Sequence, residues 1–254
     1  VLKVNGHRYM FGGRCNKYTN TRKALKDVPV FDYVEKRQKL LYETFAAPAD
    51  AIVARRDYTV GIPRAFSTHS LYPLYSWFFH ELGIKTVLST EVAQQGVVRV
   101  ESAYCFPAEI AHGAVQDCLD KGVDYVLLPH FRDMASYEDD VHANTCPITQ
   151  SLPYYIAKAF PEIDEQKFLP LVVSFKFGDK KALELFCTMT ARLGIGEAET
   201  KAAFDKALAK QREYFAAAAA LGREALEEAK AAERPVIAVL GRPYNAFTPE
   251  ANMG

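Results

Sequence analysis

Residues 123–129 spell Val-Asp-Tyr-Val-Leu-Leu-Pro, a short apolar run that lies between Gly122 and His130. A run of this length with flanking Gly and Pro predicts a strand that is buried on both faces. The residues on either side, 107–121 and 147–160, have the pattern of helices. A buried strand between two helices is typical of a parallel α/β sheet, so this stretch indicates the fold class of the chain.

The same alternation of strand and helix extends outward over residues 58–193. We expect further strands at 58–62, 85–89 and 168–175, and further helices at 71–82 and 180–193. This order predicts an α/β fold with a doubly wound, mostly parallel sheet and helices on both of its faces.

The two ends of the chain differ from this central pattern. Asn5-Gly6 between two short strand-like runs predicts a hairpin, and residues 31–45 have helical spacing. The Ala-rich residues 197–233 predict one or two long helices, and residues 234–240 predict a new strand. We therefore expect an N-terminal appendage (1–57), a first α/β domain (58–195), a helical connector (196–233) and the start of a truncated second α/β domain (234–254).

Composition narrows the classes of function. The chain has 254 residues, 49% of them hydrophobic, with 31 Lys+Arg against 31 Asp+Glu. A zero net charge argues against a general nucleic-acid-binding protein, and no apolar run approaches the roughly 20 residues of a membrane-spanning helix. The chain lacks an initiator Met, and its first residues lack the apolar segment of a signal peptide. We expect a piece of a longer cytoplasmic protein.

Two cysteines occupy similar places in the predicted fold. Cys105 and Cys146 each stand just before a helix that has a Pro in its first turn. A thiolate at a helix N-terminus is stabilised by free N–H groups and by the macrodipole, so it is prepared to bind metal. Both turns lie at the carboxyl ends of parallel strands, where ligands bind in such folds. Burial as two small apolar side chains is the alternative, and the pattern alone does not decide between them.

Other candidates are less specific. Arg64 follows the first strand, His130 follows the strand at 123–129, and Glu109 and His112 lie near Cys105, so all four are candidates for lining the crevice. Cys118 and Cys187 fall inside predicted helices and favour core packing. Cys15 follows two glycines in a turn and would serve a separate N-terminal site.

Several known motifs are absent. The chain contains no GxGxxG, no GxxxxGK[ST] and no GxSxG sequence. We therefore expect neither a dinucleotide fingerprint nor ATP hydrolysis by a P-loop.

A set of short motifs in a fixed order resembles the acyl-CoA dehydratase activase-related proteins, which are relatives of the 2-hydroxyacyl-CoA dehydratase subunits. The resemblance covers most of the chain, and no segment resembles the ATP-dependent activase part of the long members. The motifs are Gly61-Ile62-Pro63-Arg64, Tyr104-Cys105-Phe106-Pro107-Ala108-Glu109, His112-Gly113, Asp124-Tyr125-Val126-Leu127-Leu128-Pro129, Asn144-Thr145-Cys146-Pro147 and Gly241-Arg242-Pro243-Tyr244-Asn245.

The resemblance implies two flavodoxin-like domains with a [4Fe–4S] cluster between them. Cys105 and Cys146 match the pair of ligands from the first domain, and the third ligand would lie beyond Gly254. The resemblance also implies an acyl-CoA substrate and an ATP-dependent activase, as a domain or a separate protein, that donates electrons. A homo- or hetero-oligomer is left open.

Two classes of function therefore stay open. The chain is an iron–sulfur component for low-potential electron transfer or radical dehydration, acting in a lyase or in an ATP-coupled reductase. Alternatively, it is a non-catalytic α/β module for binding or assembly whose cysteines are buried and inert.

Overall fold

The computed structural model describes residues 32–48, 52–101, 105–135, 143–234, 236 and 240–251, together with the backbone of 2–4 and 7–9. The chain divides into two compact units, Val1–Asp32 and Tyr33–Gly254. In the first unit, β1 (Leu2–Val4) pairs with β2 (His7–Tyr9) in antiparallel order, with Val4 opposite His7. This is the predicted hairpin.

The second unit contains a parallel sheet of four strands. Its strand order is β4–β3–β5–β6, and every neighbouring pair is parallel, as the sequence predicted. β5 continues four residues past the predicted end at Pro129. The four strands are β3 (Thr59–Ile62), β4 (Lys85–Leu88), β5 (Tyr125–Asp133) and β6 (Phe168–Ser174).

Helices connect the strands at the predicted places, with small differences. The helix expected at 31–45 begins as α-helix and ends as a π-helical turn, and the one expected at 147–160 divides at Ser151. α3 was not expected. The helices of the second unit are α1 (Tyr33–Lys39), η3 (Leu40–Thr44), α2 (Thr68–Glu81), α3 (Gln94–Val97), α4 (Phe106–Asp120), α5 (Pro147–Gln150), α6 (Leu152–Ala159), η4 (Glu165–Lys167), α7 (Gly178–Ala191), α8 (Glu197–Ala231) and α9 (Pro243–Ala246).

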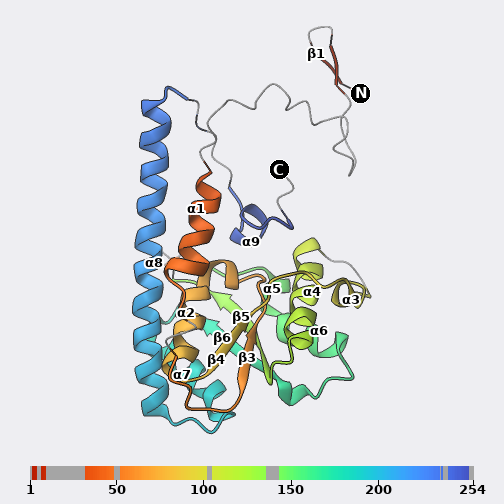
Figure 1. Cartoon of the computed structure of the whole chain (residues 1–254), viewed down its shortest axis with the longest axis vertical. Coiled ribbons are helices and arrows are strands. Elements are labelled where there is room, and N and C mark those ends of the chain that lie inside the picture. The colour runs from red at the N-terminus through yellow and green to blue at the C-terminus, as the bar shows by residue number, and fades with distance from the viewer. Residues whose placement is uncertain are drawn as a thin grey trace. The chain divides into compact units, whose positions relative to one another are not determined.

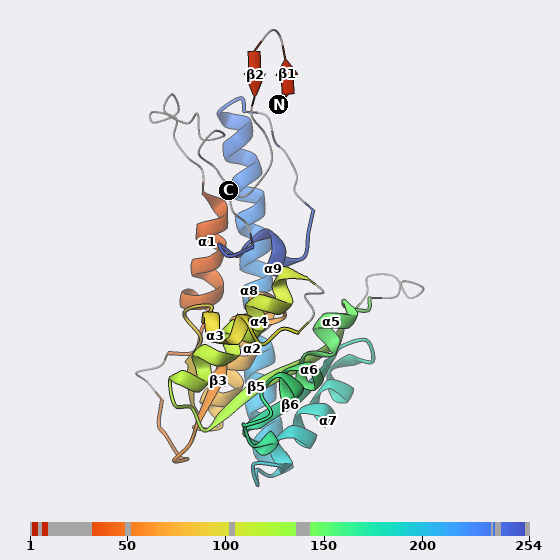
Figure 2. The same ribbon diagram turned by 90° about the vertical axis from the view of Figure 1, so that its right-hand side faces the viewer.

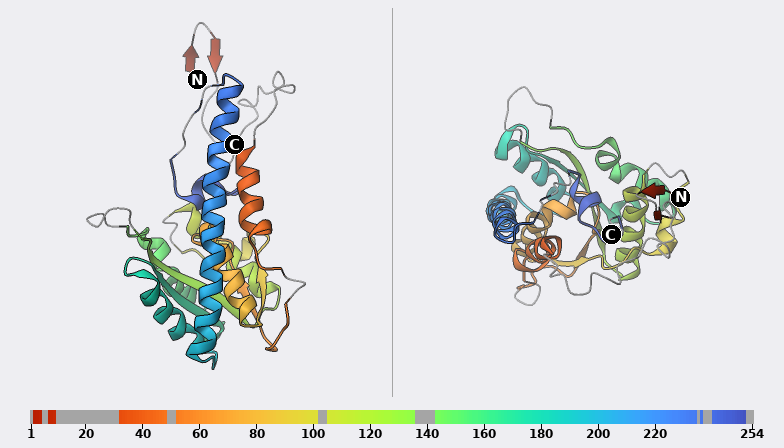
Figure 3. Two further views of the ribbon diagram at one scale, coloured as in Figure 1. Left: turned by 90° about the vertical axis from the view of Figure 1, so that its left-hand side faces the viewer. Right: turned by 90° about the horizontal axis from the view of Figure 1, so that it is seen from above.

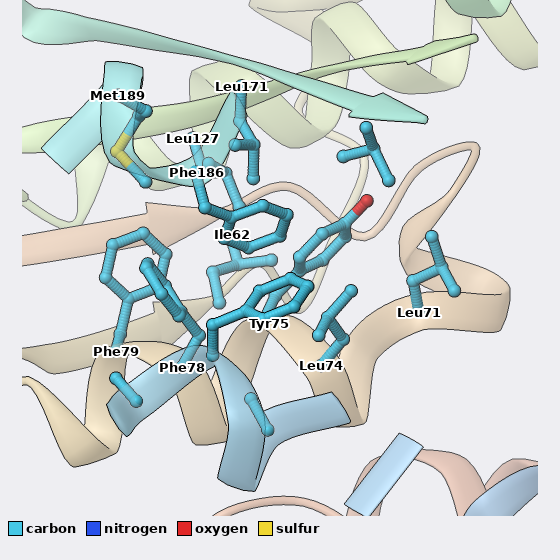
Figure 4. Packing of buried hydrophobic residues seen from close by; sticks show 14 of the residues in the cluster. Ile62, Leu71, Leu74, Tyr75, Phe78, Phe79, Leu127, Leu171, Phe186 and Met189 are labelled. Atoms are coloured by element: carbon cyan, nitrogen blue, oxygen red, sulfur yellow. The ribbon is translucent and has the colours of Figure 1, made fainter. Parts of the chain in front are cut away.

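One face of the sheet is covered by α2, α7 and α8 (Figure 1). Side chains from these helices meet strand residues such as Ile62 and Leu171 in one apolar cluster (Figure 4). Phe186 of α7 lies at its centre, with its ring centroid 4.9 Å from those of Phe78 and Phe204. Edge-to-face aromatic contacts of this kind add to the stabilisation from burial alone. This closed cluster is the main core of the molecule.

The other face is covered by α4, α5 and α6 (Figure 2). Val126 and Leu128 point to this side, while Leu127 between them points to the main core, as the period of two in a strand requires. α4 approaches the sheet closely because β3 has a glycine there: a Cβ at Gly61 would lie 2.9 Å from the Cβ of Cys118. Both faces of the sheet are therefore buried, as the apolar strand at 123–129 predicted.

α8 is a single helix of 35 residues, and it lies along α2 (Figure 3). Pro73 inside α2 has no N–H, so the carbonyl of His69 loses its helical partner and instead accepts from Arg37 Nη2 at 3.0 Å. Gln211 of α8 takes the place of the next backbone hydrogen bond of α2, which would join Leu74 N to Ser70 O. Its Oε1 accepts from Leu74 N at 3.1 Å, and its Nε2 donates to Ser70 O at 2.9 Å. The interrupted helix α2 is thus completed by side chains of α1 and α8.

The segment after α8 is described in part. The expected strand at 234–240 falls largely outside the described residues, and residues 240–251 contain the short helix α9. The predicted domain boundaries at 57, 195 and 233 stay predictions. Within the part of the chain that the structure describes, no helix is both long and apolar enough to span a bilayer.

Candidate functional site

The order of the strands places a crevice at one edge of the sheet. β4 lies on one side of β3, and β5, the next strand in the chain, lies on the other side. The carboxyl ends of β3 and β5 therefore flank a topological switch point, the position where open α/β sheets bind ligands. Pro63 and Arg64 follow β3 at this edge, and the segment after β5 returns to it at Cys146.

Both candidate cysteines lie at helix starts on this side. Cys105 is the N-cap residue of α4, with φ −161° and ψ 150°, and Cys146 is the N-cap residue of α5. Neither side chain is used in a capping hydrogen bond, and both thiols are free and half-buried. The sulfur atoms are thus reachable and lie where helix N–H groups favour negative charge.

The extension of β5 positions Cys146. Asp133 at the end of the strand forms an isolated antiparallel bridge with Asn144, and Thr145 N donates to Arg132 O at 2.9 Å. The Gln150 side chain then donates to Thr145 O at 2.9 Å. Cys146 therefore follows a segment that is held on the edge of the sheet.

Asp133 also holds the turn after β6. Its buried carboxylate accepts from Ser174 Oγ at 2.9 Å, from Phe175 N at 2.9 Å and from Lys176 N at 2.8 Å. These three hydrogen-bond donors compensate the carboxylate for the loss of water, so an aspartate is tolerated at this position although it is only 2% exposed. Sequence reasoning missed this residue.

Two tyrosines lie within electrostatic reach of both cysteines. Burial raises the pKa of Tyr155 on α6, and the thiols of Cys105 and Cys146 raise it further. Burial likewise raises the pKa of Tyr244 on α9, and the same two thiols contribute. The Tyr244 hydroxyl accepts a hydrogen bond from Thr149 Oγ1 at 3.3 Å, while the buried Tyr155 hydroxyl has no partner among the described residues. Both cysteines therefore influence the same two phenols.

His112 and Glu109 lie on α4 beside a pocket. His112 is buried, its Nδ1 lies 2.7 Å from Ala108 O, and its ring stacks on that of Tyr155 with the centroids 5.3 Å apart. Burial lowers the pKa of His112, although Glu109 partly opposes that effect. The imidazole is therefore neutral, and Nδ1 carries the proton. His112 and Tyr155 line a cavity of about 630 Å³ between the 98–101 segment and α6.

A second cavity of about 160 Å³ adjoins Cys146. It lies between the turn after β3, represented by Phe66 and Ser67, and the turn that contains Arg242 and Tyr244. The ring centroids of Phe66 and Tyr244 are 5.1 Å apart. The Gly241–Asn245 motif thus contacts the same edge of the sheet as the cysteines.

Arg64 stands apart from the cysteine pair. Its guanidinium lies 4.3 Å from the centre of the Tyr42 ring, and its carbonyl lies 3.2 Å from Nε2 of His69. His69 Nδ1 lies 2.8 Å from the Tyr42 hydroxyl, so both nitrogens of this buried imidazole have partners. Sequence reasoning did not predict this buried cluster, which joins the turn after β3 to the segment that follows α1.

His130 lies inside β5 rather than after it, because the strand continues to Asp133. Its ring is 5.8 Å from that of Tyr154, and burial lowers its pKa, with a further contribution from Arg132. Its Nδ1 is buried without a hydrogen-bond partner in the described residues.

The other cysteines lie elsewhere. Cys118 is fully buried against Gly61, and burial raises the pKa of its thiol to about 12, as expected of a core residue. Cys187 on α7 is half-buried, so its predicted place in the core is wrong. Cys15 lies outside the described residues. Within the part of the chain that the structure describes, no group of three or more His, Cys, Asp or Glu side chains converges as a metal site.

The comparison with protein families identifies one match. The model of the family described as CoA enzyme activase uncharacterised domain matches residues 59–254, which covers the whole sheet and everything after it. The comparisons found no match among curated proteins or solved structures.

Proposed function

This chain belongs to the family described as CoA enzyme activase uncharacterised domain, and from that premise we propose that it is the iron–sulfur component of a 2-hydroxyacyl-CoA dehydratase-like system. In this proposal Cys105 and Cys146 supply two thiolate ligands to a [4Fe–4S] cluster at the carboxyl edge of the sheet. The single observation that carries it is the pair of free, half-buried cysteines at the N-caps of α4 and α5, near the same two tyrosines.

The residues present suit such a group. Thiolates are the ligands that iron–sulfur clusters require, and helix N-termini favour the charge that the ligated sulfurs carry. The buried hydroxyl of Tyr155, which has no partner among the described residues, is a donor of the kind that surrounds cluster sulfurs. By contrast, Cys118 is packed against Gly61 and has a raised thiol pKa, which makes it a poor ligand.

Two thiolates are fewer than the three or four protein ligands of known clusters. The described residues offer no third donor beside them. The remaining ligand in this proposal comes from residues outside the described set or from another chain.

The residues of this chain bind and shield the group. The N-termini of α4 and α5 provide the positive ends of two dipoles, and the apolar contacts of Phe66 and Tyr244 limit the access of water at Cys146. A [4Fe–4S] cluster supplies one-electron chemistry at low potential. An acyl-CoA is the substrate class, and an ATP-dependent activase is the electron donor, within this proposal.

The test is iron and sulfide content after anaerobic purification of the full-length protein from the cell. We expect the wild type to be brown and to contain about four irons per chain, as the proposed cluster requires. Cys105→Ala and Cys146→Ala should each lose most of the iron. Cys187→Ala is the matched control, because that half-buried thiol lies on α7 of the opposite face, and its iron content should equal that of the wild type.

The same experiment decides between the two classes of function. Colourless protein in the wild type, or unchanged iron in both Cys105→Ala and Cys146→Ala, would contradict the proposal. That result would favour the alternative, a non-catalytic α/β module with inert cysteines.

A further inference from the structure

The larger cavity, between the 98–101 segment and α6, has the size and the walls of a small-molecule site. Its volume is about 630 Å³. Small-molecule sites have volumes of roughly 300–1,000 Å³ and mostly apolar walls that carry a few polar groups. The apolar residues that line the cavity are Val98, Val100, Ala108, Ile148, Ala159 and Pro161. Walls of this kind favour a ligand with an apolar body.

The charged residues of the cavity leave no net charge for a ligand to balance. Two of them are basic and two are acidic, and one pair is already formed, because Arg99 Nη2 lies 2.5 Å from Glu162 Oε1. Arg99 Nη1 also donates to Ala159 O at 3.1 Å. The remaining two, Lys158 and Glu101, are exposed and opposite in sign. The cavity therefore does not select an ionised ligand.

His112 adds one buried acceptor to the lining of the cavity. The residue is 5% exposed, and its Nδ1 lies 2.7 Å from Ala108 O. A carbonyl oxygen only accepts, so Nδ1 carries the proton and Nε2 of the neutral ring has a lone pair. Burial lowers the pKa of His112, which keeps the ring neutral. Nε2 has no hydrogen-bond partner among the described residues.

Two aromatic rings and one hydrogen bond hold the imidazole in place. The ring of His112 stacks on that of Tyr155 with the centroids 5.3 Å apart, and on that of Phe160 with the centroids 6.5 Å apart. Because Nδ1 is bound to Ala108 O as well, the direction of Nε2 is set before a ligand arrives. A buried acceptor without a partner has lost its hydration and gained nothing in return. A ligand that donates a hydrogen bond to Nε2 removes this cost.

We propose that the cavity binds a small uncharged alcohol or phenol, whose hydroxyl donates to His112 Nε2 and whose apolar body contacts the apolar walls. This inference goes beyond the proposed function and does not depend on it, because no cysteine carries it. A carboxylate is disfavoured, because its oxygens only accept and would face the lone pair of Nε2. A ligand without a donor is also disfavoured, because it leaves Nε2 unpaired.

The experiment is isothermal titration calorimetry of the full-length protein with three naphthalene derivatives of similar shape. 2-Naphthol has the O–H donor, 2-methoxynaphthalene lacks it, and 2-naphthoate has an ionised carboxylate in its place. We expect one molecule of 2-naphthol to bind per chain. The other two compounds should bind at least about tenfold more weakly.

A pair of variants tests the role of His112. His112→Asn removes the distal acceptor, while the amide nitrogen takes the place of Nδ1 and still donates to Ala108 O. The affinity for 2-naphthol should fall to the level that 2-methoxynaphthalene has in the wild type, and the affinity for 2-methoxynaphthalene should not change. His80→Asn is the matched control, because His80 is half-buried on α2, a helix of the opposite face, and this variant should keep the wild-type preference.

A second measurement needs no substitution and applies even if His112→Asn fails to fold. In wild-type protein that contains ¹⁵N-labelled histidine, the Nε2 resonance of His112 is followed by nuclear magnetic resonance. It should move upfield when 2-naphthol is added, which is the direction for a lone pair that accepts a hydrogen bond. 2-Methoxynaphthalene should move it less.

Every other outcome overturns the inference. Equal affinities for 2-naphthol and 2-methoxynaphthalene, or an unchanged preference in folded His112→Asn, would show that His112 does not accept from the ligand. Tighter binding of 2-naphthoate would make the cavity an anion site, and binding of none of the three would show that it is not a site for this class. A protein that contains no iron but prefers 2-naphthol would overturn the proposed function and leave this inference standing.

Discussion

The two faces of the sheet are built for different tasks. On the face covered by α2, α7 and α8, large aromatic side chains fill the buried core, and Phe186 makes edge contacts with two other rings. On the face covered by α4, α5 and α6, the buried cluster is smaller and a cavity of about 630 Å³ opens beside it.

The position of the cysteines follows the same division. Cys105, Cys118 and Cys146 belong to elements of the second face, and Cys187 alone of the described cysteines lies on a helix of the first. The first face therefore supplies the stability that allows the second to remain incompletely packed. We expect the functional site to lie on this second, incompletely packed face.

The largest loss of stability is expected from removing a core side chain on the first face. Phe186→Ala removes a fully buried ring and should lower the free energy of unfolding by about 3–5 kcal/mol, measured by denaturant titration. Iron per folded chain should be unchanged, because Phe186 packs in the cluster on the face of the sheet opposite to α4 and α5. A loss below about 1 kcal/mol, or iron lost from protein that is still folded, would contradict the division between the faces.

The pH dependence of stability sharpens the comparison. Burial, with a smaller contribution from Arg64, lowers the pKa of His69 to about 3, so the unfolded chain takes up the proton first as the pH falls. Stability is therefore fully present above about pH 6.5 and decreases towards pH 3, by about 1.4 kcal/mol per pH unit. His112 on the other face shifts in the same direction and should add a smaller decrease.

The measurement is the free energy of unfolding between pH 7 and pH 4 for the wild type and for His69→Gln. The variant should lose much of the slope, even if it is less stable at neutral pH. Equal slopes in the two proteins would show that His69 is not the buried neutral group described above.

The second face should be sensitive to added volume. A Cβ at Gly96 of α3 would lie 2.3 Å from the carbonyl oxygen of His112, and backbone cannot rotate out of the way. Gly96→Ala should therefore lower the free energy of unfolding by about 1–3 kcal/mol and displace α3 from α4. Near-ultraviolet circular dichroism and denaturant titration would check it, and a stable variant with wild-type spectra would contradict the close packing of these helices.

The smallest expected change in stability is an increase. Gly222 lies in the interior of α8, where a Cβ would meet no described atom within 4 Å. Gly222→Ala should raise the free energy of unfolding by about 0.5–1 kcal/mol, because alanine loses less backbone entropy in a helix. Thermal melts of this variant beside Gly96→Ala give a matched pair of glycine substitutions. A destabilised Gly222→Ala would mean that the long helix packs against something in solution.

The sheet was predictable because its signals are local. Short apolar runs alternating with helical patterns specify parallel strands, and the hairpin follows from Asn5-Gly6. The end of β5 was not predictable, because Pro129 looks like a stop. The structure tolerates this proline since β5 pairs with β3 only at Tyr125 and Val126, so one edge of the strand beyond them needs no donor.

The candidate site was likewise predictable only in part. Cys105 and Cys146 were found from the Pro that follows each within two residues, a local signal for a helix start. Tyr155 and Asp133 gave no such signal, because their importance depends on which polar atoms are paired in three dimensions. His130 was expected to follow the strand rather than to lie in it, for the same reason that β5 was predicted too short.

The most direct test of the central claim is a crystal structure of the anaerobically prepared full-length protein with anomalous data at the iron edge. We expect one compact anomalous peak within bonding distance of the sulfurs of both Cys105 and Cys146, at the carboxyl edge of β3 and β5. An iron peak bound to neither cysteine, or no iron peak in protein handled without oxygen, would contradict it.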